Sequence, residues 1–174
     1  MNWFTIKFAF FISTIFYFQD QNFSGTHEIT HHQNKTLLAV VAHPDDELAI
    51  AEVLIKYARS GYKVTVIIAT DGKEGTRVTS IPAGDSLGRI RQQESICACS
   101  KMGIEPPIFL SIERLDTRIG VRNYFNAHQQ FRIAQREKIN DNRPDIIVTF
   151  GPDGDTHHSE HIVTGCAVTE VLLQ

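Results

Sequence analysis

The chain has 174 residues, of which 42% are hydrophobic, and this is enough for one globular domain with a substantial core. Its 17 basic and 20 acidic residues give a formal net charge of −3, which excludes the basic excess typical of nucleic-acid-binding proteins. The eight histidines are many for this length, and histidine is the commonest metal ligand in proteins.

The first residues differ in composition from the rest of the chain. Lys7 precedes eleven uncharged and mostly apolar residues, 8–18, and the polar stretch QDQNFSG follows. A membrane-spanning helix needs about 20 apolar residues, whereas the apolar region of a signal peptide needs about 7–15. We therefore expect residues 1–24 to be a signal peptide or an N-terminal anchor. A third interpretation is that they form a segment buried in the folded protein. The protein is then secreted or periplasmic, or bound to a membrane only through this segment.

Beyond residue 35, strand-like and helical patterns alternate along the chain. The predicted strands are rich in aliphatic or β-branched residues and cover 36–43, 63–70, 107–111 and 145–151. The predicted helices have apolar residues at helical spacing and cover 47–59, 86–102, 122–141 and 159–173. This alternation predicts an α/β fold, with a Rossmann-like parallel sheet and helices on both faces.

Polar residues gather where the predicted strands end. HPDDE (43–47) follows the first strand, DGKEGT (71–76) the second, and GPDGDTHHSEH (151–161) the fourth. Ligands of open parallel sheets bind outside the carboxyl ends of the strands. We therefore expect the active site at this edge of the sheet.

The first and last of these loops together contain a set of metal ligands. Two imidazoles and one carboxylate, with a fourth position open for water, form a common catalytic zinc site. His43, Asp46 and His161 provide this set, and the same ligands accept Fe²⁺ or Co²⁺. Asp45 is then near enough to act as the general base on the metal-bound water, whose pKa zinc lowers to about 7.

Each cluster also has an interpretation without a metal. Asp45 or Asp46 could cap the helix that begins near Glu47, where a carboxylate is stabilised by the helix dipole. The histidines of the last loop could simply be exposed loop residues. A metal site is favoured because two separate clusters of histidine and carboxylate fall at one edge of the sheet.

The motif AHPDDE (42–47), placed after an apolar strand, resembles the signature of the PIG-L/LmbE-type deacetylases. These are zinc enzymes that remove the acetyl group from N-acetylglucosaminyl groups. The resemblance extends over residues 36–165 and includes, in the family's order, TDGKEG (70–75), RQQE (91–94), MG (102–103), LD (115–116) and HSEH (158–161). It implies that residues 35–174 form a deacetylase domain of this kind.

The resemblance also implies a role for individual residues. Zinc would bind His43, Asp46 and His161, as inferred above. Asp45 would be the general base, and His158 the imidazole that polarises the acetyl carbonyl and stabilises the oxyanion.

Two further residues are implied to bind the sugar. Arg91 is similar to the family's sugar-contacting arginine, although an ion pair with Glu94 is an equal alternative. Asp116 is similar to a residue that binds sugar hydroxyls.

Two features depart from the family's pattern. Ser159 and Glu160 stand where the family usually has proline and aspartate. Glu160 is one methylene longer, so we expect its supporting contact with His158 to be displaced, a change that typically alters activity by about 10–100-fold. Family members also generally continue well past residue 174, so we expect the domain to be incomplete at its C-terminal side.

We therefore expect a zinc-dependent hydrolase that removes the N-acetyl group from an N-acetylglucosamine-type amino sugar or its conjugate. Its partner would be a small-molecule or glycan substrate. The alternatives are an amidase acting on a thiol–sugar conjugate and a catalytically inactive sugar-binding homologue. A dinucleotide-binding domain is disfavoured, because no G-x-G-x-x-G follows the first predicted strand.

Overall fold

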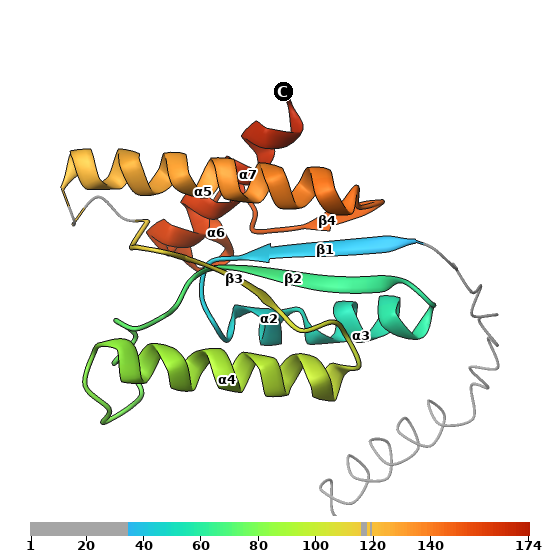
Figure 1. Ribbon diagram of the computed structural model, residues 1–174, viewed down its shortest axis with the longest axis horizontal. Coiled ribbons are helices and arrows are strands. Elements are labelled where there is room, and N and C mark those ends of the chain that lie inside the picture. The colour runs from blue at the N-terminus through green and yellow to red at the C-terminus, as the bar shows by residue number, and fades with distance from the viewer. Residues whose placement is uncertain (1–34, 116–117, 119) are drawn as a thin grey trace, which may run out of the picture.

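The computed structural model describes residues 35–115, 118 and 120–174, and its strands form one parallel sheet (Figure 1). The strands are β1 (Thr36–Val41), β2 (Lys63–Thr70), β3 (Ile108–Ile112) and β4 (Ile146–Val148). Their order in the sheet is β3-β2-β1-β4, and all neighbouring pairs are parallel. The α/β fold with a parallel sheet, predicted from the alternating pattern, is confirmed.

The helices follow the predicted segments, with one interruption and with one short additional helix, Gly154–His157, in the predicted loop 151–158. They are α2 (Asp46–Ala49), α3 (Ala51–Arg59), α4 (Asp85–Met102), α5 (Val121–Asn142), α6 (Gly154–His157) and α7 (Ser159–Leu172). The single helix predicted for 47–59 is divided at Ile50, whose backbone (φ −115°, ψ 16°) is not helical. Within the described ranges, no helix has the length and apolarity to cross a membrane. The leader predicted for residues 1–24 lies outside those ranges.

Helices cover both faces of the sheet (Figure 1). Side chains alternate along a strand, so β1 contributes to two separate cores. Leu38 and Val40 pack with buried residues of α5 and α7 on one face. Leu37, Ala39 and Val41 pack with buried residues of α3 and α4 on the other. Because β1 is covered on both faces, its sequence is a continuous apolar run rather than an alternating one.

The strand order places the loops after β1 and β4 beside each other. From β1 the chain moves through β2 to β3 on one side, then returns to β4 on the opposite side of β1. The boundary between β1 and β4 is therefore a topological switch point, and the loops that follow both strands leave the same edge of the sheet. Such switch points are where α/β sheets bind ligands.

Candidate metal centre and cavity

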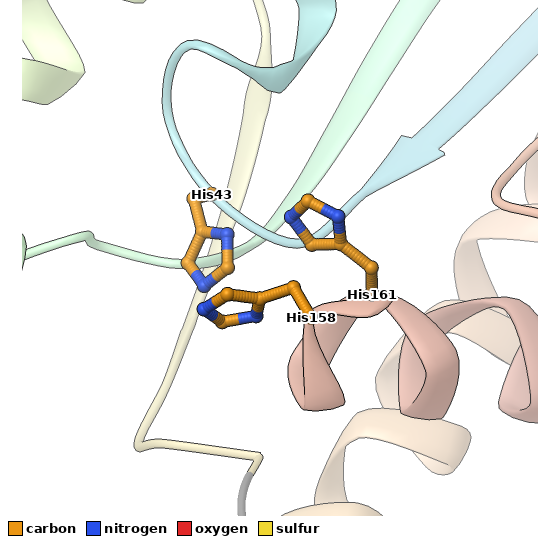
Figure 2. A group of neighbouring side chains, drawn as sticks. All are labelled: His43, His158 and His161. Carbon is orange, nitrogen blue, oxygen red and sulfur yellow. The ribbon is translucent and has the colours of Figure 1, made fainter. Parts of the chain in front are cut away.

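Three imidazoles meet at this edge of the sheet (Figure 2). His43 comes from the loop after β1, and His158 and His161 come from the start of α7. The ring centroids lie 5.0 Å apart for His43 and His158, 5.3 Å for His43 and His161, and 4.8 Å for His158 and His161. One ligand atom from each ring lies within 4.8 Å of the other two. The two histidine-bearing loops thus converge, as their positions after parallel strands predict.

Asp46 lies between two of these rings. Its Oδ1 is 3.3 Å from Nε2 of His161, and its Oδ2 is 3.4 Å from Nδ1 of His43. The Oδ2 atom also accepts hydrogen bonds from the backbone N–H groups of Ala42 (3.1 Å) and His43 (2.7 Å). The carboxylate is therefore turned back toward β1, and it does not act as the helix cap that the alternative interpretation assigned to it.

The outer nitrogens of both rings are held by acceptors. Nε2 of His43 lies 2.7 Å from Oε2 of Glu160, and Nδ1 of His161 lies 3.1 Å from the carbonyl oxygen of Gly154. A carboxylate and a carbonyl can only accept, so each of these ring nitrogens carries a hydrogen. Metal-binding histidines typically donate their second N–H in this way, leaving the other nitrogen for the metal.

The spacing of the inner atoms suits a tetrahedral ion. Two ligands that each lie about 2.0–2.1 Å from such an ion are about 3.3 Å from each other. The two distances from the Asp46 carboxylate to the rings are 3.3 and 3.4 Å. The two contacts use different oxygens of Asp46, Oδ1 with His161 and Oδ2 with His43. The three imidazoles of His43, His158 and His161 are a second possible ligand group, so the ligand set inferred from the sequence remains a prediction.

In the absence of a metal, His43 and Asp46 form an ion pair. Burial alone would lower the pKa of His43, but its hydrogen bonds to Asp46 and Glu160 outweigh burial and raise the pKa to about 9. Burial alone would raise the pKa of Asp46, but the hydrogen bond and charge of His43 hold it below its ordinary value. A proton on Nδ1 of His43 thus occupies the position at which a metal would bind.

His158 is held in one tautomer at the start of α7. Its Nδ1 accepts a hydrogen bond from the backbone N–H of Glu160 at 3.3 Å and so caps the helix. In the neutral ring, the hydrogen is therefore on Nε2. Burial, and then the charges of His43 and His161, lower the pKa of His158, which favours this neutral form. The residue can donate Nε2–H to an oxygen atom of a bound molecule.

The side chain of Glu160 contacts a different histidine from the one expected. It is 6% exposed, and its carboxylate reaches His43 through Oε2 and the backbone N–H of Leu115 through Oε1 (2.7 Å). Its backbone N–H donates to Nδ1 of His158. The carboxylate therefore orients a candidate metal ligand and fixes the segment after β3. Asp116, the next residue of that segment, lies outside the described residues.

Asp45 is fixed by an arginine of α4. Nη2 of Arg91 donates to Oδ2 of Asp45 (2.8 Å) and to the carbonyl of Pro44 (2.5 Å), and Nη1 donates to the carbonyl of Gly72 (2.9 Å). Gly72 has a φ of +67°, and a Cβ there would lie 2.5 Å from Nη1, so glycine leaves the room that the guanidinium needs. Arg91 thus joins the loops after β1 and β2. A contact between Arg91 and a sugar remains a prediction.

A cavity of about 700 Å³ opens beside these residues, within the range of small-molecule sites. His43, Asp45, Arg91, His158 and Glu160 line it. The remaining wall comes from the loop after β2 and from the end of β3. The candidate general base, Asp45, and one candidate metal ligand, His43, therefore face one space that can hold a small molecule.

Sequence reasoning did not identify two residues that position His161. The Phe150 ring stacks on the His161 ring, with centroids 4.1 Å apart and planes 6° apart. Gly165 of α7 packs on the backbone of Phe150, since a Cβ at Gly165 would lie 2.5 Å from the Phe150 carbonyl oxygen. In the sequence, an aromatic residue at the end of a strand and a glycine in a helix look like ordinary core packing.

Comparison with known proteins gives a family and several relatives. Residues 38–172 match the family model PIG-L, described as GlcNAc-PI de-N-acetylase. A 1D-myo-inositol 2-acetamido-2-deoxy-alpha-D-glucopyranoside deacetylase from Rhodococcus erythropolis is 34% identical over 155 residues, covering 79% of this chain and 53% of that protein. The chain thus spans about half the length of the curated relatives it matches. The family resemblance noted in the sequence is confirmed.

Solved structures share the fold. The N,N'-diacetylchitobiose deacetylase from Pyrococcus horikoshii has a TM-score of 0.62 and 22% identity, covering 80% of this chain and 49% of that chain. A zinc-inhibited form of a teicoplanin deacetylase has a TM-score of 0.65 and 17% identity, covering 79% of this chain and 63% of that chain. At these identities the likeness establishes the fold, and the chemistry has to be argued from the site.

Proposed function

This chain belongs to the PIG-L family of GlcNAc-PI de-N-acetylases, and on that premise we propose that it is a metal-dependent amide hydrolase. Its substrate would be a small molecule or glycan that carries an N-acetylglucosamine-type amino sugar, and the acetyl group would be removed. The observation that carries the proposal is the position of Asp46, 3.3 Å from His161 and 3.4 Å from His43. The relatives named above are deacetylases, which supports the same chemistry.

We assign His43, Asp46 and His161 as the metal ligands. Zinc is the metal that this ligand set suits best, although Fe²⁺ and Co²⁺ also bind such sites. When bound, zinc would lower the pKa of a coordinated water to about 7 and withdraw electrons from the acetyl oxygen.

Two residues of the cavity would carry out the proton transfers. Oδ2 of Asp45 is held by Arg91, so we assign Oδ1 as the atom that takes a proton from the attacking water. The water oxygen bonds to the acetyl carbon, and Nε2–H of His158 stabilises the negative charge that develops on the acetyl oxygen. The C–N bond then breaks, and Asp45 returns its proton to the departing nitrogen. The products are acetate and a free amino sugar.

The contacts of Glu160 support an active enzyme over an inactive sugar-binding homologue. The extra methylene does not leave the carboxylate without partners, because both oxygens meet donors, one from His43 and one from Leu115. The carboxylate at this position therefore orients His43, which we assign as a metal ligand, in place of the expected contact with His158. None of the described residues that line the cavity favours a thiol–sugar amide over an acetyl group.

Acetate release from the full chain tests this proposal. The wild type, Asp45→Ala and His161→Ala are compared with and without a chelator, on an N-acetylglucosaminyl-inositol and on diacetylchitobiose. We expect the wild type alone to release acetate, and the chelator to stop it. Activity of His161→Ala equal to that of the wild type would refute the mechanism. Saccharide binding without turnover by the zinc-loaded wild type would favour the inactive homologue.

A further inference from the structure

Glu47 is a buried acid next to the candidate active site that the proposed reaction does not use. Its side chain is 1% exposed, and its Oε2 accepts a hydrogen bond from the backbone N–H of Asp45 at 2.9 Å. Its Oε1 is buried with no hydrogen-bond partner among the described residues. Burying a carboxylate that is only partly hydrogen-bonded is unfavourable. We therefore expect Glu47 to have a function that offsets this cost.

The residue that Glu47 contacts has an unusual backbone. Asp45 has φ 102° and ψ −22°, in the left-handed region that residues other than glycine rarely adopt. Such conformations persist when surrounding contacts hold them, and they gather at active sites. Asp45 is held at two points, by Glu47 at its backbone N–H and by Arg91 at its carboxylate.

The contact with Glu47 is one half of a familiar helix-capping arrangement. In a capping box, the first residue caps the helix with its side chain, and a glutamate three residues later bonds back to the N–H of that first residue. Glu47 makes the same kind of return bond from two residues after Asp45. Asp45 stands at the capping position of α2, but its side chain makes no capping hydrogen bond. Only the return bond from Glu47 is formed. The Asp45 carboxylate is therefore free of the helix, 62% exposed, and lines the cavity.

We propose that Glu47 is a positioning residue that holds Asp45 in its left-handed conformation and so directs the Asp45 carboxylate into the cavity. The inference rests on the proposed function, in which Asp45 is the general base. Glu47 would act through Asp45 and not through the metal centre. Asp46 is fixed separately by the N–H groups of Ala42 and His43, so the metal ligands do not depend on Glu47.

Kinetics of the zinc-loaded full chain provide the first test. Glu47→Ala should lower kcat for acetate release about 100-fold, the effect of a catalytic group displaced by about 1 Å, with KM and zinc content unchanged. Glu47→Gln keeps an oxygen that can accept the Asp45 N–H, and it should restore most of the loss. Glu52→Ala removes an exposed carboxylate in the first turn of α3 and should match the wild type.

A double variant separates positioning from a general structural effect. If Glu47 acts only through Asp45, adding Glu47→Ala to Asp45→Ala should cause no further loss of the residual activity. A further loss equal to that seen in the wild-type background would refute the proposal, as would loss of zinc from Glu47→Ala. If the alanine variant does not fold, Glu47→Asp, whose shorter side chain falls short of the Asp45 N–H, replaces it in the same comparison.

Amide hydrogen exchange of Asp45, measured by NMR, gives a readout that does not depend on turnover. The Asp45 N–H should exchange about tenfold faster in Glu47→Ala than in the wild type or Glu47→Gln, because only the alanine variant loses the side-chain oxygen that accepts its hydrogen bond. Equal exchange in the wild type and Glu47→Ala would refute the role of Glu47. Absence of acetate release from the wild type would instead refute the proposed function.

Discussion

Nε2 of His43 lies 2.7 Å from Oε2 of Glu160, and these residues are 117 positions apart in the chain. The other oxygen of the same carboxylate accepts the N–H of Leu115. One side chain at the start of α7 therefore connects the loop after β1 to the segment after β3. Because the contact leaves Nδ1 of His43 facing Asp46, Glu160 should control how a metal is bound more than how the acetyl group reacts.

The first prediction follows from that contact. Glu160→Ala should weaken zinc binding about 10–100-fold, because His43 loses the acceptor that orients its ring. Competition with a chromophoric chelator measures the affinity. Glu137→Ala, an exposed acid on α5, is the matched control and should bind zinc as the wild type does. Equal affinities for Glu160→Ala and the control would show that the contact does not orient the ligand.

The second prediction concerns pH. Since the pKa of metal-free His43 is raised to about 9, the ring is protonated at pH 7, and zinc must displace that proton. We expect about one proton to be released per zinc at pH 7, with zinc affinity rising about tenfold per pH unit and levelling near pH 9. Titration calorimetry in buffers of different ionisation enthalpy measures the release. Binding with no proton released at pH 7 would contradict the raised pKa.

The same group makes the stability of the metal-free protein depend on pH. A pKa that is higher in the folded than in the unfolded chain stabilises the fold fully below the ordinary histidine value of 6.5. This contribution is lost as the pH rises through about 9. The metal-free protein should therefore unfold at a lower temperature at pH 10 than at pH 6, and His43→Gln should reduce that difference.

The edge of the sheet that holds the site could be predicted because it depends on chain direction alone. Continuous apolar runs such as that of β1 indicate buried parallel strands, and parallel strands bring their carboxyl ends to one edge. The proximity of His43 and His161 follows from this rule. No side-chain conformation is needed to reach it.

Contacts that depend on side-chain length and rotation could not be predicted in the same way. The length of Glu160 predicted that its contact with His158 would be displaced, but not that its carboxylate would reach His43 instead. Arg91 binds Asp45 and two backbone carbonyls, because glycines beside it leave room for the guanidinium. The motif HPDDE is typical of the start of a helix, and nothing in it indicates that Asp45 adopts a left-handed backbone.

The third prediction tests the proposed oxyanion donor. His158→Ala should lower kcat about 10²–10³-fold, the usual effect of removing one oxyanion donor, while zinc affinity stays close to that of the wild type. Acetate release and zinc content are measured on the same preparations. His157→Ala changes the exposed neighbour and serves as the control. A parallel loss of zinc in His158→Ala would indicate that His158 is a metal ligand instead.

The fourth prediction concerns stability away from the site. Gln135 of α5 is 0% exposed, and both polar atoms of its amide are buried without a hydrogen-bond partner in the described part of the chain. Methionine has a volume similar to that of glutamine, so Gln135→Met removes the unpaired amide oxygen and nitrogen without leaving a large cavity. It should raise the free energy of unfolding by about 1–3 kcal/mol, measured by urea denaturation. Gln130→Met, at an exposed position of the same helix, should change it little.

The fifth prediction links the packing of α7 to the candidate metal centre. Alanine in place of glycine inside a helix normally stabilises it by about 0.5–1 kcal/mol. At Gly165, however, the added Cβ would lie 2.5 Å from the Phe150 carbonyl oxygen, and a backbone atom cannot rotate away. Crowding of this kind costs about 1–3 kcal/mol, so we expect Gly165→Ala to destabilise the protein.

The same substitution should also change the position of His161. Phe150 stacks on the His161 ring, and α7 carries His161, so moving the helix away from Phe150 separates the ring from its support. Zinc affinity should fall together with the unfolding temperature in Gly165→Ala. Cys166→Ala changes the next, exposed residue of the same helix and should alter neither quantity. If Gly165→Ala lowers stability but binds zinc like the control, the approach of α7 to Phe150 supports the fold without positioning His161.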